Sequence, residues 1–224
     1  MVAALSAADP ADPLAQGAVT AAFAQHGPAA ADRLAARRRA TVSLEPRGAA
    51  MASWAATAGH LLGRAGIGCV ADPDPTATVA VVLSDGEPDR DALDEALRTG
   101  RPHVVLTASG GAVRVGPFVV PGLTACLRCV DAHLGERDER RGVVLQQHVS
   151  PGLDPHGLPA PLDPVLMTMA VAWAVGDVLG FVAGDPPSTW SATATLEPGL
   201  APIVRAWRRH PHCGCCWGDL LDAG

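Results

Sequence analysis

Five of the six cysteines fall in two short clusters, a residue type and spacing that suit metal coordination. Cys126 and Cys129 are separated by two residues, and Cys213, Cys215 and Cys216 stand together near the C-terminus. A Cys-x-x-Cys segment bends the chain so that two thiolates point to one side. Two such segments supply the sulfurs of a closed tetrahedral Zn²⁺ site, with Zn–S bonds of about 2.3 Å. The sequence therefore predicts a structural zinc ion that joins the middle of the chain to its tail.

The spacing leaves the fourth ligand open. Cys216 completes a second Cys-x-x-Cys with Cys213 and is the favoured choice, with Cys215 as the alternative. His210 and His212 flank the cluster and could replace a sulfur, although a role beside the metal is expected. Residues 1–30 lack the basic start and apolar run of a secretory signal. We therefore expect a cytoplasmic location, where paired cysteines favour metal over the competing disulfide interpretation.

Composition limits the classes of protein to which the chain can belong. Its 224 residues are 48% hydrophobic, enough for one large domain or a domain with a small appendage. The net charge of −6 argues against a nucleic-acid partner. The chain contains no lysine and no asparagine, so it cannot perform chemistry that needs either side chain.

The order of the apolar segments predicts an α/β fold. Residues 1–39 are expected to form an extension that is disordered at first and helical over 17–39, with a break at Gly27-Pro28. Residues 40–224 are expected to form the main domain. Its first part alternates apolar strands and helices, which is typical of a Rossmann-like doubly wound sheet. The predicted strands are 40–44, 79–83 and 103–107, and the predicted helices are 50–64 and 90–98.

The second part of the main domain contains both cysteine clusters, at 126–129 and 213–216. A helix over 125–134 is expected to start at the first cluster, and 142–162 to form an irregular loop. The apolar stretch 163–183 is long enough for a membrane span. Asp177 lies inside it and no charge asymmetry flanks it, so a buried helix and no membrane partner are expected. Further strands are predicted at 113–120, 189–196 and 203–207.

Three stretches resemble ThiF/MoeB/HesA-type activating enzymes. Residues 61–68, followed by Asp72-Pro73-Asp74, resemble the end of their first helix and their second strand. Residues 116–129 and 210–216 are similar to their two zinc knuckles. The resemblance covers about residues 38–218 and is nearest to actinobacterial ThiF-like proteins associated with ribosomal peptide biosynthesis, which include leader-peptide-binding partners of cyclodehydratases. It implies an activating-enzyme fold, a structural zinc and a homodimer. Some relatives end in Cys-Gly-Cys, which keeps Cys215 in contention.

The residues that would handle ATP in such enzymes are largely missing. The family's glycine-rich turn between the first strand and helix corresponds to residues 44–53, where Gly48 alone remains as a glycine. The family's Asn-Leu-x-Arg-Gln segment and lysine have no counterpart. We therefore expect weak or absent ATP and Mg²⁺ binding, and no catalytic residues. Gly48, Asp72 and Asp74 could be remnants that hold a ribose or Mg²⁺; the alternative is a turn with two solvated carboxylates.

These observations support three hypotheses. The leading one is a catalytically degenerate, zinc-binding ThiF-like protein that acts as a binding or scaffold partner in the biosynthesis of ribosomally made peptides such as thiazole- or oxazole-containing ones. Its partner would be a precursor or leader peptide, or a peptide-modifying enzyme. The alternatives are an active ATP-dependent adenylyltransferase and a zinc or thiol redox protein.

Overall fold

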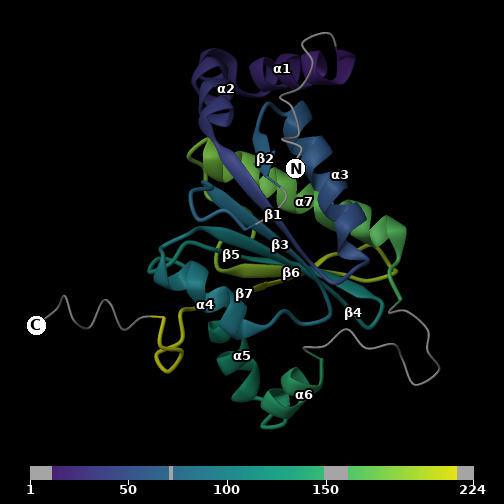
Figure 1. The fold of residues 1–224 in the computed structure, drawn as a ribbon, viewed down its shortest axis with the longest axis vertical. Coiled ribbons are helices and arrows are strands. Elements are labelled where there is room, and N and C mark those ends of the chain that lie inside the picture. Colours follow the sequence, from purple (N-terminus) through teal and green to yellow (C-terminus); the bar gives the residue numbers. More distant parts are fainter. Residues whose placement is uncertain (1–11, 71–72, 149–160, 216–224) are drawn as a thin grey trace, which may run out of the picture.

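A computed structural model describes residues 12–70, 73–148 and 161–215 and shows an α/β protein with a seven-stranded sheet. The strand order is β2-β1-β3-β4-β5-β6-β7 (Figure 1). The strands are β1 (Thr41–Arg47), β2 (Gly68–Val70), β3 (Val79–Asp85), β4 (His103–Ser109), β5 (Ala112–Val119), β6 (Ala192–Leu196) and β7 (Ile203–Ala206). Six of them lie close to the predicted strands, and β2 lies where the resemblance implies a second strand. The predicted α/β class is confirmed.

The first four strands are parallel, and the chain changes direction across the sheet between β1 and β3. From β1 the helix α3 (Met51–Arg64) leads to β2 on one side. The chain then passes back to place β3 on the other side of β1, and α4 (Arg90–Arg98) leads to β4. Where strand order reverses in this way, a crevice forms at the carboxyl ends of the two strands.

The last three strands are antiparallel. β4 turns directly into β5 through Gly110 and Gly111, both with positive φ, and β6 and β7 follow in turn. The short strand β7 ends the sheet. Among the residues that the structure describes, no strand pairs with its outer side.

Helices α3 and α7 (Pro164–Val182) cover one face of the sheet (Figure 1). Asp163 begins α7 by accepting the amides of Val165 and Leu166, as expected for an N-cap. The helix is long and apolar enough to cross a membrane. Here it instead packs against α3, β4 and β5, and it buries a stripe that includes Leu166, Ala170 and Val178 in the core. It is therefore a core helix of the sheet.

The opposite face carries α4, α5 (Leu127–Gly135) and α6 (Arg141–His148) (Figure 1). The prediction of irregular backbone over 142–162 is wrong at its start, because α6 occupies 141–148. Arg141 accounts for the difference: its guanidinium donates to Glu87 and Asp131, which fixes this segment against α5. Long-range contacts thus outweigh the local loop signals. Residues 149–160 lie outside the described part of the chain.

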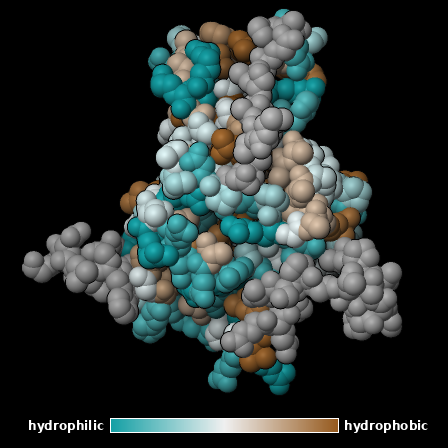
Figure 2. Space-filling model, in the orientation of Figure 1, coloured by the Kyte–Doolittle hydropathy of each residue, from teal (hydrophilic) through white to brown (hydrophobic). Residues whose placement is uncertain are grey.

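Two helices precede the sheet, α1 (Pro13–His26) and α2 (Ala30–Arg39), joined by a short 3₁₀ turn η1 (Gly27–Ala29). The predicted break at Gly27 is present, but α1 starts before residue 17 because Asp12 caps it. Leu14, Val19 and Phe23 of α1 are exposed, and Figure 2 shows hydrophobic residues among hydrophilic ones at this end of the molecule. The division into an extension, 1–39, and a main domain stays a prediction.

Asp177 is a charged residue buried inside α7, only 5% exposed. Its carboxylate accepts the amide and hydroxyl of Ser188 at 2.7 and 2.8 Å. It also accepts the amide of Thr189 at 3.1 Å and a short bond from the Thr189 hydroxyl. The carbonyl of Thr189 in turn accepts the amide of Phe118. One carboxylate therefore holds the segment that leads from α7 into the antiparallel strands.

We predict that Asp177→Ala lowers the free energy of unfolding by at least about 3 kcal/mol, because several buried donors lose a charged acceptor. Asp177→Asn should cost less, since one acceptor oxygen remains. Asp185→Ala is the control: it removes the ion pair of an exposed carboxylate with Arg33 and should cost much less, because solvent screens such pairs. Urea unfolding measures all three. Equal losses for the two alanine variants would contradict this role of Asp177.

Candidate metal centre

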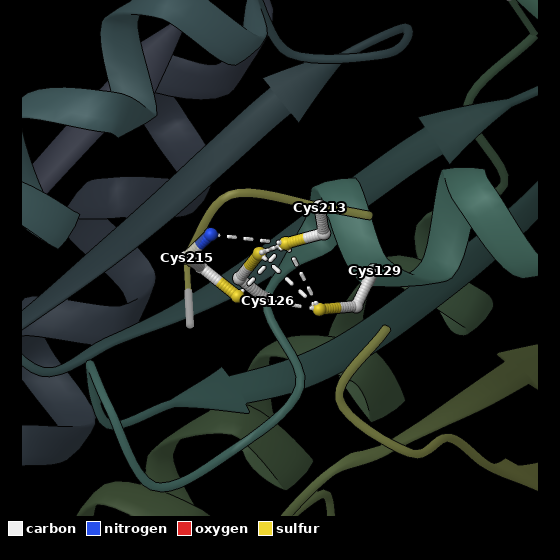
Figure 3. Close-up of side chains that lie close together, drawn as sticks. All are labelled: Cys126, Cys129, Cys213 and Cys215. Carbon is white, nitrogen blue, oxygen red and sulfur yellow. Dashed lines mark hydrogen bonds between the residues drawn. The ribbon is translucent and has the colours of Figure 1, made fainter. Parts of the chain in front are cut away.

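Four cysteine side chains from two distant segments meet beside the start of α5. Cys126 is the N-cap of that helix, and Cys129 lies in its first turn. Cys213 and Cys215 come from the turn that follows β7, with Gly214 at φ 79° between them. Figure 3 shows the four sulfurs pointing toward one another. The structure thus brings together the predicted Cys126, Cys129 and Cys213 with the alternative Cys215. Cys216, the favoured fourth ligand, lies outside the described residues.

The sulfur positions suit one metal ion. Sulfurs bound tetrahedrally at about 2.3 Å would stand about 3.8 Å apart. The separations from Cys129 are 3.8 Å to Cys126, 3.2 Å to Cys213 and 3.4 Å to Cys215. Those of Cys213 are 3.5 Å to Cys126 and 2.8 Å to Cys215. None approaches the disulfide length of about 2.05 Å. A cluster of four thiols, with the ligand atoms all within 4.8 Å of one another, fits a tetrahedral thiophilic ion such as Zn²⁺.

The surroundings favour a thiolate at this place. The thiols of Cys126, Cys213 and Cys215, in that order, hold the pKa of Cys129 well below its usual range, and the amide of His210 adds a bond at 3.3 Å. The amino end of α5 adds a positive partial charge at the same sulfurs. Cys126 and Cys129 are buried, while Cys213 and Cys215 are half-buried. Because a metal ligand must be deprotonated, these features prepare the cluster for an ion.

Contacts on either side of the sulfurs bring the tail to the cluster. The guanidinium of Arg209 donates to the carbonyl of Gly122, in the turn before α5. The indole N–H of Trp207 donates to Thr193 of β6 at 2.9 Å. The hydroxyl of Ser191, just before β6, accepts the amide of Ala125 at 2.9 Å. The last strands and the start of α5 are therefore bound to each other around the cysteine cluster.

His210 lies beside the sulfurs and bonds through its backbone amide to Cys129, so it supports the ligand set. Its ring, with His133 and Glu136, forms a second group of possible ligands. However, Nδ1 of His210 accepts the amide of His212 at 3.2 Å, so Nε2 carries the proton and faces Glu136 at 3.0 Å. That nitrogen has no lone pair for a metal. We interpret the group as a hydrogen-bonded brace.

Two of the three predicted nucleotide remnants, Gly48 and Asp74, lie in the described structure, and Asp74 is not part of the cavity wall that includes Gly48. Asp74 accepts the amide and hydroxyl of Thr76 at 2.8 and 2.7 Å, so its carboxylate closes its own turn. Asp72 lies outside the described residues. Gly48 lines a cavity of about 380 Å³ at the carboxyl ends of β1 and β3. A side chain there would come within 3.0 Å of the Cβ of Asp85, so the turn needs glycine for close packing.

The cavity beside Gly48 is acidic, a property that the sequence did not reveal. Its wall includes Asp85, Glu87 and Asp89, and Arg47 is its one basic residue among the described residues. Burial raises the pKa of Asp85, and one of its carboxylate oxygens is buried without a hydrogen-bond partner in the described part of the chain. Asp89 caps α4 by accepting the amide of Asp91. The run of acids after β3 is the signal that could have found this site.

Glu87 belongs to a largely buried network of charges under this cavity. It is paired with Arg90, Arg114 and Arg141, and Arg90 and Arg141 also bind Asp131 of α5. Burial opposes ionisation of Glu87, but the guanidiniums of Arg114 and Arg90 outweigh it and lower its pKa to about 2. The network ties the end of β3 to β5, α5 and α6, and so connects the cavity wall to the helix that carries Cys126 and Cys129.

Glu45, near the end of β1, does not add to this charge. It is only 3% exposed. Its carboxylate pairs with Arg101 at 2.9 Å and Arg47 at 3.1 Å, and accepts the hydroxyl of Ser43. The acidity of the cavity therefore comes from Asp85, the last residue of β3, and from Glu87 and Asp89 after it.

Comparison with solved structures shows what this fold is similar to. The heterocyclase TruD matches with a TM-score of 0.68 and 23% identity over 88% of this chain and 30% of its own. E. coli MccB with ATP matches with a TM-score of 0.59 and 15% identity, over 84% of this chain and 69% of its own. The microcin C7 biosynthetic enzyme MccB with N-formylated MccA matches with a TM-score of 0.62 and 14% identity, over 90% of this chain and 75% of its own. The chain spans less than a third of the heterocyclase. No protein-family model and no curated protein matches the sequence.

These similarities define a class of fold. The chain shares its α/β architecture with part of a heterocyclase and with the microcin C7 biosynthetic enzyme MccB. At such low identity the likeness establishes the fold alone, so the function must be argued from the residues of this chain.

We predict that Cys215→Ser reduces bound zinc from about one ion per chain to well below half, because one of four thiolates is lost. Cys216→Ser should keep its zinc. Cys69→Ala is the control: Cys69 is buried on β2, away from the cluster. Elemental analysis of each purified variant measures the metal. Zinc lost in Cys216→Ser and kept in Cys215→Ser would instead make Cys216 the fourth ligand.

We also predict an acid-dependent contribution from Glu87. Because its pKa falls from 4.5 to about 2 on folding, it stabilises the protein fully above pH 4.5, and this is lost as the pH falls toward 2. The change corresponds to about 3 kcal/mol. The difference in unfolding free energy between the wild type and Glu87→Gln should therefore shrink over that range. Glu95→Gln, at an exposed position of α4, is the control. A pH-independent difference would contradict the network.

Proposed function

We propose that this protein is a zinc-stabilised, Rossmann-like ThiF-type partner in the biosynthesis of ribosomally made peptides. It would bind a precursor peptide or a peptide-modifying enzyme without activating a substrate with ATP. The shared fold with a heterocyclase and with MccB supports a role in peptide modification. The four converging cysteines support a structural zinc. A homodimer and a cytoplasmic location are parts of the same proposal.

The observation that carries the proposal is the acidic crevice at the carboxyl ends of β1 and β3. A nucleotide triphosphate carries several negative charges and needs donors or cations there. The crevice instead presents Asp85 and Asp89 near the single glycine of the turn. The basic residues beneath it are already engaged, since Arg90, Arg114 and Arg141 pair with Glu87. The chain has no lysine to add.

One observation favours the alternative, an ATP-dependent adenylyltransferase. The amino end of α3 has no side-chain cap, because Ala50 occupies that position. Free amides there could meet a phosphate, and Asp85 could hold Mg²⁺. We favour the binding role because no positively charged side chain other than Arg47 lines the cavity in the described chain.

Two measurements on the full zinc-loaded chain test the proposal. Calorimetric titration with each precursor peptide and modifying enzyme encoded beside it should show saturable binding to at least one. ATP–pyrophosphate exchange should stay at background with the same peptides present. Robust exchange that Asp85→Asn abolishes would establish the adenylyltransferase instead. No binding to any such partner would overturn the proposed role.

A further inference from the structure

The outer strand β7 presents an apolar edge that no other strand of the described residues covers. Ile203 and Val204 are 52% and 59% exposed, and Leu200 just before them is 46% exposed. The side chains of the whole strand are exposed, although its other side is paired with β6. An exposed edge strand of this kind can pair with another extended segment unless charges or a bulge prevent it.

The hydrogen-bonding pattern shows which backbone groups face outward. The amide of Trp207 donates to the carbonyl of Ser191 at 2.7 Å, in register with the pairing of Arg205 with Thr193. In an antiparallel ladder, hydrogen-bonded and non-hydrogen-bonded pairs alternate. Ile203 and Arg205 therefore bond to β6. Val204 and Ala206 direct their amides and carbonyls to the open side.

A cavity of about 230 Å³ lies beside this edge, on the face that carries α5. Its wall combines the hydroxyl residues Thr193 and Thr195 with the ring of Trp207, and the guanidinium carbon of Arg205 lies 5.5 Å from that ring. Arg114 adds a second positive charge, partly offset by Glu87, and Glu197 is the one acid of the wall among the described residues. In a chain of net charge −6, this is a locally basic site.

We propose that β7 and this cavity bind an extended acidic peptide segment as an additional strand. Val204 and Ala206 would pair with its backbone, and Arg205 would receive an Asp or Glu side chain at the mouth of the cavity. Alternating residues of the segment would lie on the apolar edge. This inference rests on the proposed function, because it supplies the surface for a peptide partner.

Charge favours this occupant over a second copy of the chain. If two β7 strands paired antiparallel through both outward-facing residues, Val204 would meet Ala206 of the second copy. The two Arg205 side chains would then stand directly opposite each other, an arrangement that destabilises strand pairing. An acidic segment places the opposite charge there instead.

The test uses an acetylated, amidated peptide, Thr-Val-Asp-Val-Glu-Val-Thr, and its matched amide form, Thr-Val-Asn-Val-Gln-Val-Thr. Titration into the zinc-loaded chain should show saturable binding of the acidic form, with NMR shifts of the Val204 and Ala206 amides. Val204→Pro removes an outward amide without touching the ladder to β6, and should weaken binding by about tenfold. Arg205→Gln should weaken the acidic form roughly fivefold and leave the amide form unchanged.

Arg38→Gln, on the exposed end of α2, is the control of equal charge change and should leave the affinity unaltered. Zinc content and thermal unfolding check that Val204→Pro is folded. If that variant does not fold, Arg205→Gln still tests the proposal.

Equal affinity of the protein for both peptides, or NMR shifts at residues away from β7, would overturn the proposal. So would a dimer that Val204→Pro converts to monomer, since a second copy would then occupy the edge. If a natural partner binds wild type and Val204→Pro equally, the proposed function stands and this site does not.

Discussion

The meeting of two thiol pairs beside the start of α5 is the constraint on which the rest of the molecule depends. The segment after β7 buries Trp207 against α5. Beyond that residue it is held by polar contacts, such as the bond from Arg209 to Gly122. A metal bound by these four thiolates would add far more than such contacts, because its binding free energy would become folding free energy. It would fix the last two strands against α5, and with them the edge of the sheet.

The parallel and antiparallel halves of the sheet differ in the kind of ligand that they suit. In the parallel half, the crevice between β1 and β3 has the position at which α/β folds bind ligands. Its carboxylates and its single glycine make it poor for phosphate. In the antiparallel half, the cysteine cluster holds β6 and β7 in place with an open edge and basic surroundings. The α/β fold thus combines an acidic crevice in one half of the sheet with an open strand edge in the other, which is the basis of the proposed peptide contact.

The sequence predicts the strands and helices well where periodicity is strong. The apolar run at Val79 and the caps of α4 and α7 place those elements within a few residues. It also predicts that Cys126, Cys129 and Cys213 converge, since paired thiols at this spacing are typical of a shared metal ion. It does not predict α6, because that helix depends on ion pairs of Arg141 with residues far along the chain. Equally, the spacing alone does not predict that Cys215 joins the other three thiols, because this depends on the backbone turn at Gly214.

The ion-pair partners of charged side chains are the hardest feature to predict from the sequence. Glu45 and Glu87 are both acids near the ends of strands, and only three-dimensional contacts show that arginines neutralise them. The same holds for the basic site beside β7, where Arg114 and Arg205 come from strands β5 and β7, on either side of β6.

The most direct test of the central claim is X-ray absorption at the zinc edge of the purified full chain. Four converging thiolates predict a single shell of four sulfur atoms at about 2.3 Å. A shell that mixes sulfur with nitrogen or oxygen, or a protein that folds and purifies without zinc, would contradict it.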